Sequence, residues 1–183
     1  MMKNLTALLP NNMAIKRQIK FSLRPFKTGD ALAIAKNINN KKIYRYTLRI
    51  PYPYKLADAH SYLKRLAIKI KKGETFNRAI VIDGEVVGCV SLEQIIKNHQ
   101  AELGYWLAEK YWRQGVMTKA VGQMGNYGFN KLGLKRIYAY VFPANQASAK
   151  VLLNNGFNKE GLLRKNAIKN GQPVDDYLFA KVR

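Results

Sequence analysis

Cysteine and histidine are nearly absent from this sequence, whose 183 residues contain one cysteine, Cys89, and two histidines, His60 and His99. A single thiol excludes an internal disulfide framework and fits a reducing compartment such as the cytoplasm. Neither histidine has a second ligand residue at the spacing of a metal site, so we expect no metal. No apolar run approaches the ~20 residues that cross a bilayer, so we expect no transmembrane helix and no membrane partner.

Acidic residues are also few. Eleven Asp and Glu stand against 32 Lys and Arg, which gives a formal net charge of +21. Such an excess attracts polyanions, so association with RNA or a ribosome through a basic surface is one interpretation. The basic residues are nevertheless scattered, with no arginine-rich tail and no aromatic-basic signature of RNA recognition, so a solvated lysine-rich surface is the other. Charge alone suggests partners without identifying them.

Apolar residues, in contrast, are plentiful: hydrophobic residues make up 48% of the chain, and there are 11 tyrosines. This content supports a packed core and excludes a disordered polycation. At this length we expect one domain over residues 1–183, because no linker, repeat or low-complexity block interrupts it. Residues 1–14 lack the length and cleavage site of a secretory signal. We expect residues 1–17 to form a flexible or peripheral extension.

The spacing of the apolar residues switches between the period of strands and that of helices. Two residue pairs, Asp83-Gly84 and Asn170-Gly171, separate strand-like runs and predict two-residue hairpin turns. The expected elements are a strand at 19–23, helices at 31–35 and 56–71, strands at 76–82, 86–92 and 101–108, a helix at 116–131, a strand at 136–142, a helix opened by Asn145 or Ser148, and two strands flanking 169–172. This order predicts an α+β (mixed α/β) fold with antiparallel pairs.

The turn that precedes the helix at 116–131 carries the clearest chemical signal. A helix N-terminus leaves backbone N–H groups unpaired and concentrates partial positive charge. Gly115 lets a ligand approach without meeting a Cβ, Arg113 adds charge, and the Thr118 hydroxyl can donate to phosphate. We interpret the turn as an anion site suited to pyrophosphate, with an ordinary strand-to-helix turn as the alternative. It matches neither the Walker nor the Rossmann pattern.

Residues 101–107 and 111–121, AELGYWL and YWRQGVMTKAV, resemble the acetyl-CoA-binding motif of the GNAT N-acetyltransferases. Residues 142–152, with Asn155-Gly156-Phe157, resemble the second motif of the ribosomal-protein-alanine N-acetyltransferase branch. The likeness spans about residues 21–180. It implies a twisted, mostly antiparallel sheet of about six or seven strands with one splayed strand pair, flanked by about four helices. The chain departs from the superfamily at Met117, where the pattern has a small residue.

The resemblance also implies an activity, namely transfer of an acetyl group from acetyl-CoA to a primary amine by direct attack in a ternary complex. In the family the pantetheine arm lies between the splayed strands, and a backbone N–H, here at about Trp106, polarises the thioester. The resemblance implies that Asn145 hydrogen-bonds the pantetheine arm, with capping of the next helix as its alternative role. The implied cofactor-binding residues are Trp106, Leu107, Arg113, Gln114, Gly115, Val116, Met117, Thr118 and Asn145.

Two residues are implied for proton transfer. Glu102 matches a catalytic glutamate of some members, and a partly apolar cleft raises the pKa of such a carboxylate toward neutrality. Pairing with a nearby lysine or arginine is the alternative for Glu102. Many members carry a tyrosine acid where this chain has Leu152, so Ser148 is the best hydroxyl for that role. A helix-capping serine is the alternative.

The acceptor is less defined by the sequence. We expect a protein N-terminal amine, for example of a ribosomal protein, with a small polyamine-type amine as the runner-up. The charge disfavours polyamines unless Asp175 and Asp176 offset it at the pocket mouth. A non-catalytic module that binds RNA or ribosomes is the alternative from another class. The resemblance places Tyr52 and Tyr54 beside the acceptor, with core packing as the alternative. Both a monomer and a homodimer fit.

Overall fold

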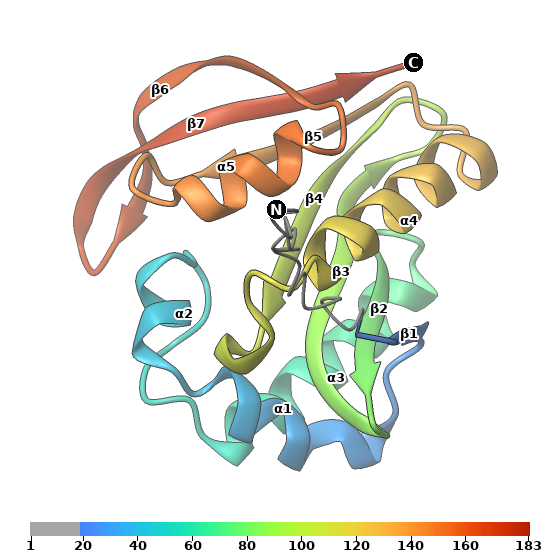
Figure 1. Ribbon diagram of the computed structural model, residues 1–183, viewed down its shortest axis with the longest axis vertical. Helices are drawn as coiled ribbons and strands as arrows, with labels where there is room; N and C mark the ends of the chain where they lie inside the picture. Colours follow the sequence, from blue (N-terminus) through green and yellow to red (C-terminus); the bar gives the residue numbers. More distant parts are fainter. Residues whose placement is uncertain (1–18) are drawn as a thin grey trace, which may run out of the picture.

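The computed structural model describes residues 19–183, so the expectation for residues 1–17 lies outside the described residues. A single seven-stranded sheet runs in the order β1-β2-β3-β4-β5-β7-β6 (Figure 1). The elements are β1 (Ser22–Arg24), α1 (Ala31–Ile38), α2 (Lys41–Arg45), α3 (Leu56–Lys71), β2 (Phe76–Ile82), β3 (Glu85–Ile96), β4 (Gln100–Leu107), α4 (Val116–Lys131), β5 (Arg136–Val141), α5 (Gln146–Leu153), β6 (Asn158–Lys169) and β7 (Gln172–Val182), with 3-10 turns at Thr28–Asp30 and Glu109–Tyr111.

Both predicted hairpin turns are confirmed. Asp83 and Gly84 join β2 to β3 with φ angles of 49° and 78°, and Asn170 and Gly171 join β6 to β7 with 52° and 75°. Positive φ at both central residues is what a type I′ turn requires, and this turn matches the natural twist of the two strands. The sheet is mostly antiparallel, as the hairpins predict, and β4–β5 is its one parallel pair.

The sequence pattern missed one helix, so the described chain has five α-helices where about four were expected. Helix α2 is a single turn of five residues, too short to show a hydrophobic period. The side chain of Asn40 caps it by accepting hydrogen bonds from the backbone N–H of Lys42 at 2.7 Å and of Ile43 at 3.3 Å. Side-chain capping therefore defines this helix where periodicity could not.

Strands β4 and β5 confirm the splayed pair. Their parallel ladder holds only three residue pairs: Gln100 with Arg136, Ala101 with Ile137 and Glu102 with Tyr138. Beyond this ladder β4 continues to Leu107 and β5 to Val141 without pairing to each other. The sheet therefore contains a wedge that opens after Glu102.

The helices cover opposite faces of the sheet. Leu103 and Leu107 of β4 pack into a core that includes residues of α4 and α5. Trp106 of the same strand packs against the core formed by α1, α2 and α3. Because side chains alternate along a strand, Glu102, Gly104 and Trp106 share the α1–α3 face. No helix within residues 19–183 is long and apolar enough to span a membrane.

Candidate active site

The turn before α4 is open at its N-terminal end. Gly115 caps the helix with a φ of 77°, and a Cβ built on it would meet no heavy atom within 4 Å. The first helical hydrogen bond runs from Lys119 N to Gly115 O at 3.1 Å. The N–H groups of Val116, Met117 and Thr118 therefore have no helical acceptor, which is the arrangement that binds anions.

The side chains at this turn leave that space clear. The side chains of Val116 and Met117 are buried in the core, with exposed fractions of 2% and 8%. The methionine at position 117, where the family pattern has a small residue, therefore places no side chain in front of the turn. Gln114 turns back, and its Nε2 donates to Lys110 O at 2.7 Å. Arg113 is exposed beside the turn. Backbone amides and one guanidinium are therefore the groups this segment offers to an anion.

The pairing of β4 with β3 decides which backbone N–H of β4 faces the wedge. The sequence predicted an N–H at about Trp106. Ala108 N donates to Val87 O of β3 at 2.8 Å. Hydrogen-bonding direction alternates along an antiparallel strand, so the backbone of Trp106 also faces β3. The amide of Leu107 instead faces the wedge, while its carbonyl accepts from Trp112 Nε1 at 2.6 Å. Leu107, not Trp106, thus supplies the N–H on the side of β5.

Helix α5 brings Ser148 to β4 through a contact that the sequence did not reveal. The Oδ1 of Asn145 accepts from Ser148 N at 3.1 Å, so Asn145 is the helix cap and Ser148 lies in the first turn. The Ser148 hydroxyl lies 2.7 Å from the Tyr105 hydroxyl. Burial raises the pKa of Tyr105, which keeps this phenol protonated. Ser148 and Tyr105 therefore form a hydroxyl pair beside the wedge.

Glu102 lies on the opposite face of β4 from Tyr105. Its carboxylate accepts a hydrogen bond from Gln94 Nε2. Burial raises the pKa of Glu102, Glu93 and Asp176 add to that rise, and Arg49 opposes it. Among residues 19–183 Glu102 forms no ion pair, because Arg49 pairs with Glu93 at 3.5 Å instead. A raised pKa makes this carboxylate a better proton acceptor than an exposed glutamate.

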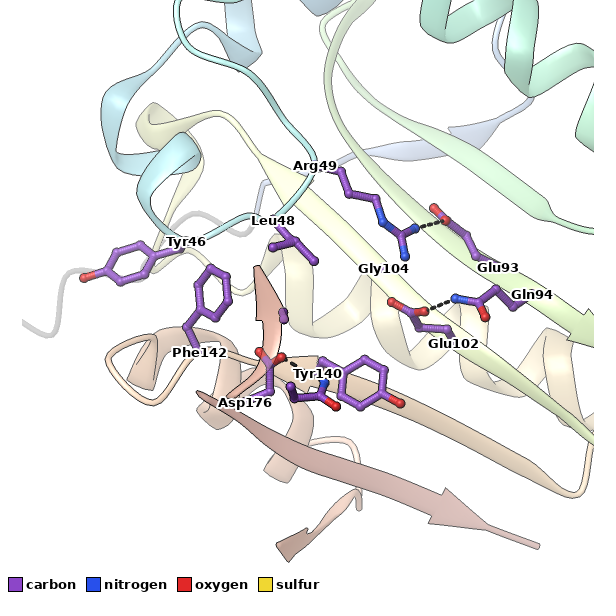
Figure 2. Close-up of a pocket in the computed structure, with 12 residues that line it drawn as sticks. Tyr46, Leu48, Arg49, Glu93, Gln94, Glu102, Gly104, Tyr140, Phe142 and Asp176 are labelled. Atoms are coloured by element: carbon purple, nitrogen blue, oxygen red, sulfur yellow. Dashed lines mark hydrogen bonds and ion pairs between the residues drawn. The ribbon is translucent and has the colours of Figure 1, made fainter. Parts of the chain in front are cut away.

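Glu102 lines a cavity of about 360 Å³ where the wedge between β4 and β5 begins (Figure 2). Five segments build its walls: the chain between α2 and α3, β3, β4, β5 with the residue after it, and the β6–β7 hairpin. Three carboxylates line it, those of Glu93, Glu102 and Asp176. These are three of only 11 acidic residues in the chain. The cavity is therefore locally negative, although the protein has a net charge of +21.

The two tyrosines expected at the acceptor site do not line this cavity. Tyr54 is a core residue at 8% exposure, and burial raises its pKa to about 12. Tyr52 is 45% exposed and lies against Tyr44, with ring centroids 5.8 Å apart. The same loop reaches the cavity through Tyr46, Leu48 and Arg49 instead.

Cys89 is buried, and burial raises its pKa to about 12, so it remains an unreactive thiol at neutral pH. In the described part of the chain no group of three or more His, Cys, Asp or Glu side chains is placed to hold a metal ion.

The wedge between the parallel strands therefore lies between an open helix N-terminus and a carboxylate-lined cavity. Residues 20–158 match the acetyltransferase (GNAT) domain family. The chain belongs to this family and is an acyltransferase.

Relatives cover most of the chain. An uncharacterized N-acetyltransferase, YoaA of Bacillus subtilis, is 32% identical over 88% of this chain and 92% of its own length. The ribosomal-protein-S5-alanine acetyltransferase of Vibrio fischeri superposes with a TM-score of 0.80 at 28% identity, covering 88% of this chain and 92% of that one. RimJ of Mycobacterium smegmatis, solved with CoA-disulfide, gives 0.81 at 27% identity, covering 88% and 81%.

Proposed function

We propose that this protein transfers the acetyl group of acetyl-CoA to the N-terminal amine of a protein, such as a ribosomal protein, by direct attack in a ternary complex. The observation that carries this proposal is the wedge itself. It joins the open turn of α4 on one face of the sheet to the carboxylate cavity on the other. A cofactor on one face and an amine on the other therefore meet without either crossing a closed sheet.

The residues around the turn fit the cofactor. Its diphosphate would face the amides of Val116, Met117 and Thr118, with Arg113 adding charge, and its pantetheine arm would lie in the wedge by the Leu107 amide. When bound, acetyl-CoA supplies an acyl group activated as a thioester. The protein holds that group where the wedge opens, within reach of the cavity, and the gain from such positioning is large.

Glu102 and the Ser148–Tyr105 pair divide the proton transfers between the two faces. Glu102 takes a proton from the acceptor ammonium, directly or through a water, which frees the nitrogen lone pair for attack. Ser148, hydrogen-bonded to the protonated Tyr105, donates a proton toward the leaving thiolate. The Leu107 N–H stabilises the developing oxyanion. Each group acts on the face where the strand places it.

A small polyamine-type amine is a second candidate, and one observation favours it. Repulsion of cations by the net charge was the argument against it, and Asp176 offsets that repulsion because it lines the cavity.

The test is turnover and binding measured together. We expect acetyl-CoA to raise the Tm of the purified protein and to release free thiol when an N-terminal peptide of a ribosomal protein is added. The same peptide with a blocked N-terminus serves as the control and should release none. An unchanged Tm at millimolar acetyl-CoA would contradict the cofactor assignment. Equal thiol release from the blocked peptide would contradict the acceptor assignment.

A further inference from the structure

The Asp176 carboxylate in the acceptor cavity is buried without a counter-ion. Asp176 is 4% exposed and accepts one hydrogen bond, from Asn166 Nδ2 at 3.1 Å. It forms no ion pair with any lysine or arginine of residues 19–183. Lys169 of the same hairpin is held elsewhere, by the carbonyl oxygens of Tyr44 and Thr47. A buried carboxylate is costly unless a positive group pairs with it.

The three carboxylates that line the cavity differ in their cationic partners. Glu93 already pairs with Arg49. Glu102 is the proposed base and faces the ammonium that reacts. Asp176 enters from β7, on another wall from Glu102 of β4, and is left without a cation (Figure 2). Glu102 and Asp176 therefore offer two carboxylates on separate walls of the cavity, of which only Glu102 has a role in the proposed function.

We propose that Asp176 binds a second positive charge of the acceptor, so that the preferred substrate is a primary amine that carries another cationic group. This rests on the proposed function, and it names the class of amine. That second charge belongs either to the far ammonium of a small diamine or to a lysine or arginine side chain close to a protein N-terminus. The chemistry at Asp176 is the same for both sources.

The other walls of the cavity suit a cation as well. Tyr140 lines it with no lysine or arginine of residues 19–183 over its ring, whereas Arg45 lies over Tyr46 and Lys169 over Phe142, and aromatic faces attract ammonium groups. The net charge of +21 repels cations over the outer surface, but salt screens such repulsion beyond about 8 Å at physiological ionic strength. Inside the cavity three carboxylates face one lining arginine, Arg49, so the local charge stays negative.

Two matched substrate pairs test the proposal and separate its sources. One pair is 1,5-diaminopentane and n-hexylamine, equal in heavy atoms. The other is a short peptide with lysine in second place and the same peptide with norleucine there. We expect the dication of at least one pair to be favoured about tenfold or more in kcat/KM. The pair that shows the preference identifies the source. No preference in either pair would overturn the proposal.

Asp176→Asn is the decisive variant, and Asp175→Asn is its control. Asparagine keeps an oxygen for Asn166 while removing the charge, so Asp176→Asn should reduce the preference to about twofold or less. We expect its Tm to be unchanged or higher, because a buried charge is removed. Asp175 accepts from Lys165 N at 2.8 Å and does not line the cavity, so Asp175→Asn should retain the preference. Equal preferences in the two variants would overturn the assignment to Asp176.

Calorimetry with CoA present separates this proposal from the proposed function. If wild-type protein acetylates none of the amines but binds 1,5-diaminopentane, and Asp176→Asn does not, the subsite stands and the acetylation proposal falls. If hexylamine and diaminopentane are acetylated equally well, and the lysine and norleucine peptides are also acetylated equally well, the acetylation proposal stands and the subsite falls. If wild-type protein neither acetylates nor binds the diamine or the lysine peptide, both fall.

Discussion

The two faces of the sheet present groups of opposite charge by different means. On the α4–α5 face the proposed anion site consists of backbone amides and one exposed arginine, and Gly115 leaves it open. On the other face three carboxylates line a cavity built by five segments of chain. A helix N-terminus generates its positive potential from local structure alone. The cavity depends on tertiary assembly, and the wedge after Glu102 connects the two.

The largest effect is expected when the proposed base on the cavity face of the sheet is removed. Glu102→Gln should lower kcat by about 100-fold or more at neutral pH, because the acceptor ammonium loses its proton acceptor. The Kd for acetyl-CoA should stay near that of wild-type protein, since the cofactor binds on the other face. A free-thiol release assay measures kcat, and calorimetry measures the Kd for acetyl-CoA. Glu74→Gln, at an exposed position, is the control. Normal turnover in Glu102→Gln would remove Glu102 from the mechanism.

An intermediate effect is expected at the cofactor turn. Gly115→Ala places a methyl group in the open space before the amides and forces alanine to a φ of 77°. We expect the Kd for acetyl-CoA to rise about tenfold and stability to fall by about 1–2 kcal/mol.

Gly171→Ala is the matched control, because Gly171 has a φ of 75°, equally open surroundings, and a place in the β6–β7 turn. It should lose similar stability while keeping normal cofactor affinity. Similar Kd values for the two variants would show that the turn does not bind the cofactor.

The smallest effect concerns pH. Glu102 must be deprotonated to act, so kcat/KM rises with pH through its pKa, which burial has already raised. Arg49 lowers that pKa, whereas Glu93 and Asp176 raise it. Arg49→Met should therefore move the acidic limb of the profile to higher pH, and Glu93→Gln should move it to lower pH. The same acceptor is used throughout, so its own ionisation cancels. Shifts of the same sign in both variants would contradict this electrostatic account.

The sequence was most informative where structure is local. The hairpin turns at Asp83-Gly84 and Asn170-Gly171 are determined by two residues each. The turn at Gly115 is determined by the N-terminus of a single helix. These turns could be predicted because the residues that cause each one lie close together in the sequence. The wedge was expected from the family resemblance alone.

The remaining features depend on contacts between distant segments. Asp176 and Glu102 line the same cavity only when β7 pairs with β5, and Tyr105 meets Ser148 only when α5 docks. A one-residue change in register decides whether the amide of Trp106 or of Leu107 faces the wedge. Tyr52 and Tyr54 were expected at the cavity, and the loop instead presents Tyr46 there. No local pattern encodes such choices.

The most direct test of the connected faces is a crystal structure with a bisubstrate compound in which CoA is joined through its sulfur to an acetyl-linked diamine. We predict that its diphosphate contacts the amides of residues 116–118, that its pantetheine arm separates β4 from β5, and that its amine ends beside Glu102. A compound bound wholly on one face, with β4 and β5 paired along their full length, would contradict this account.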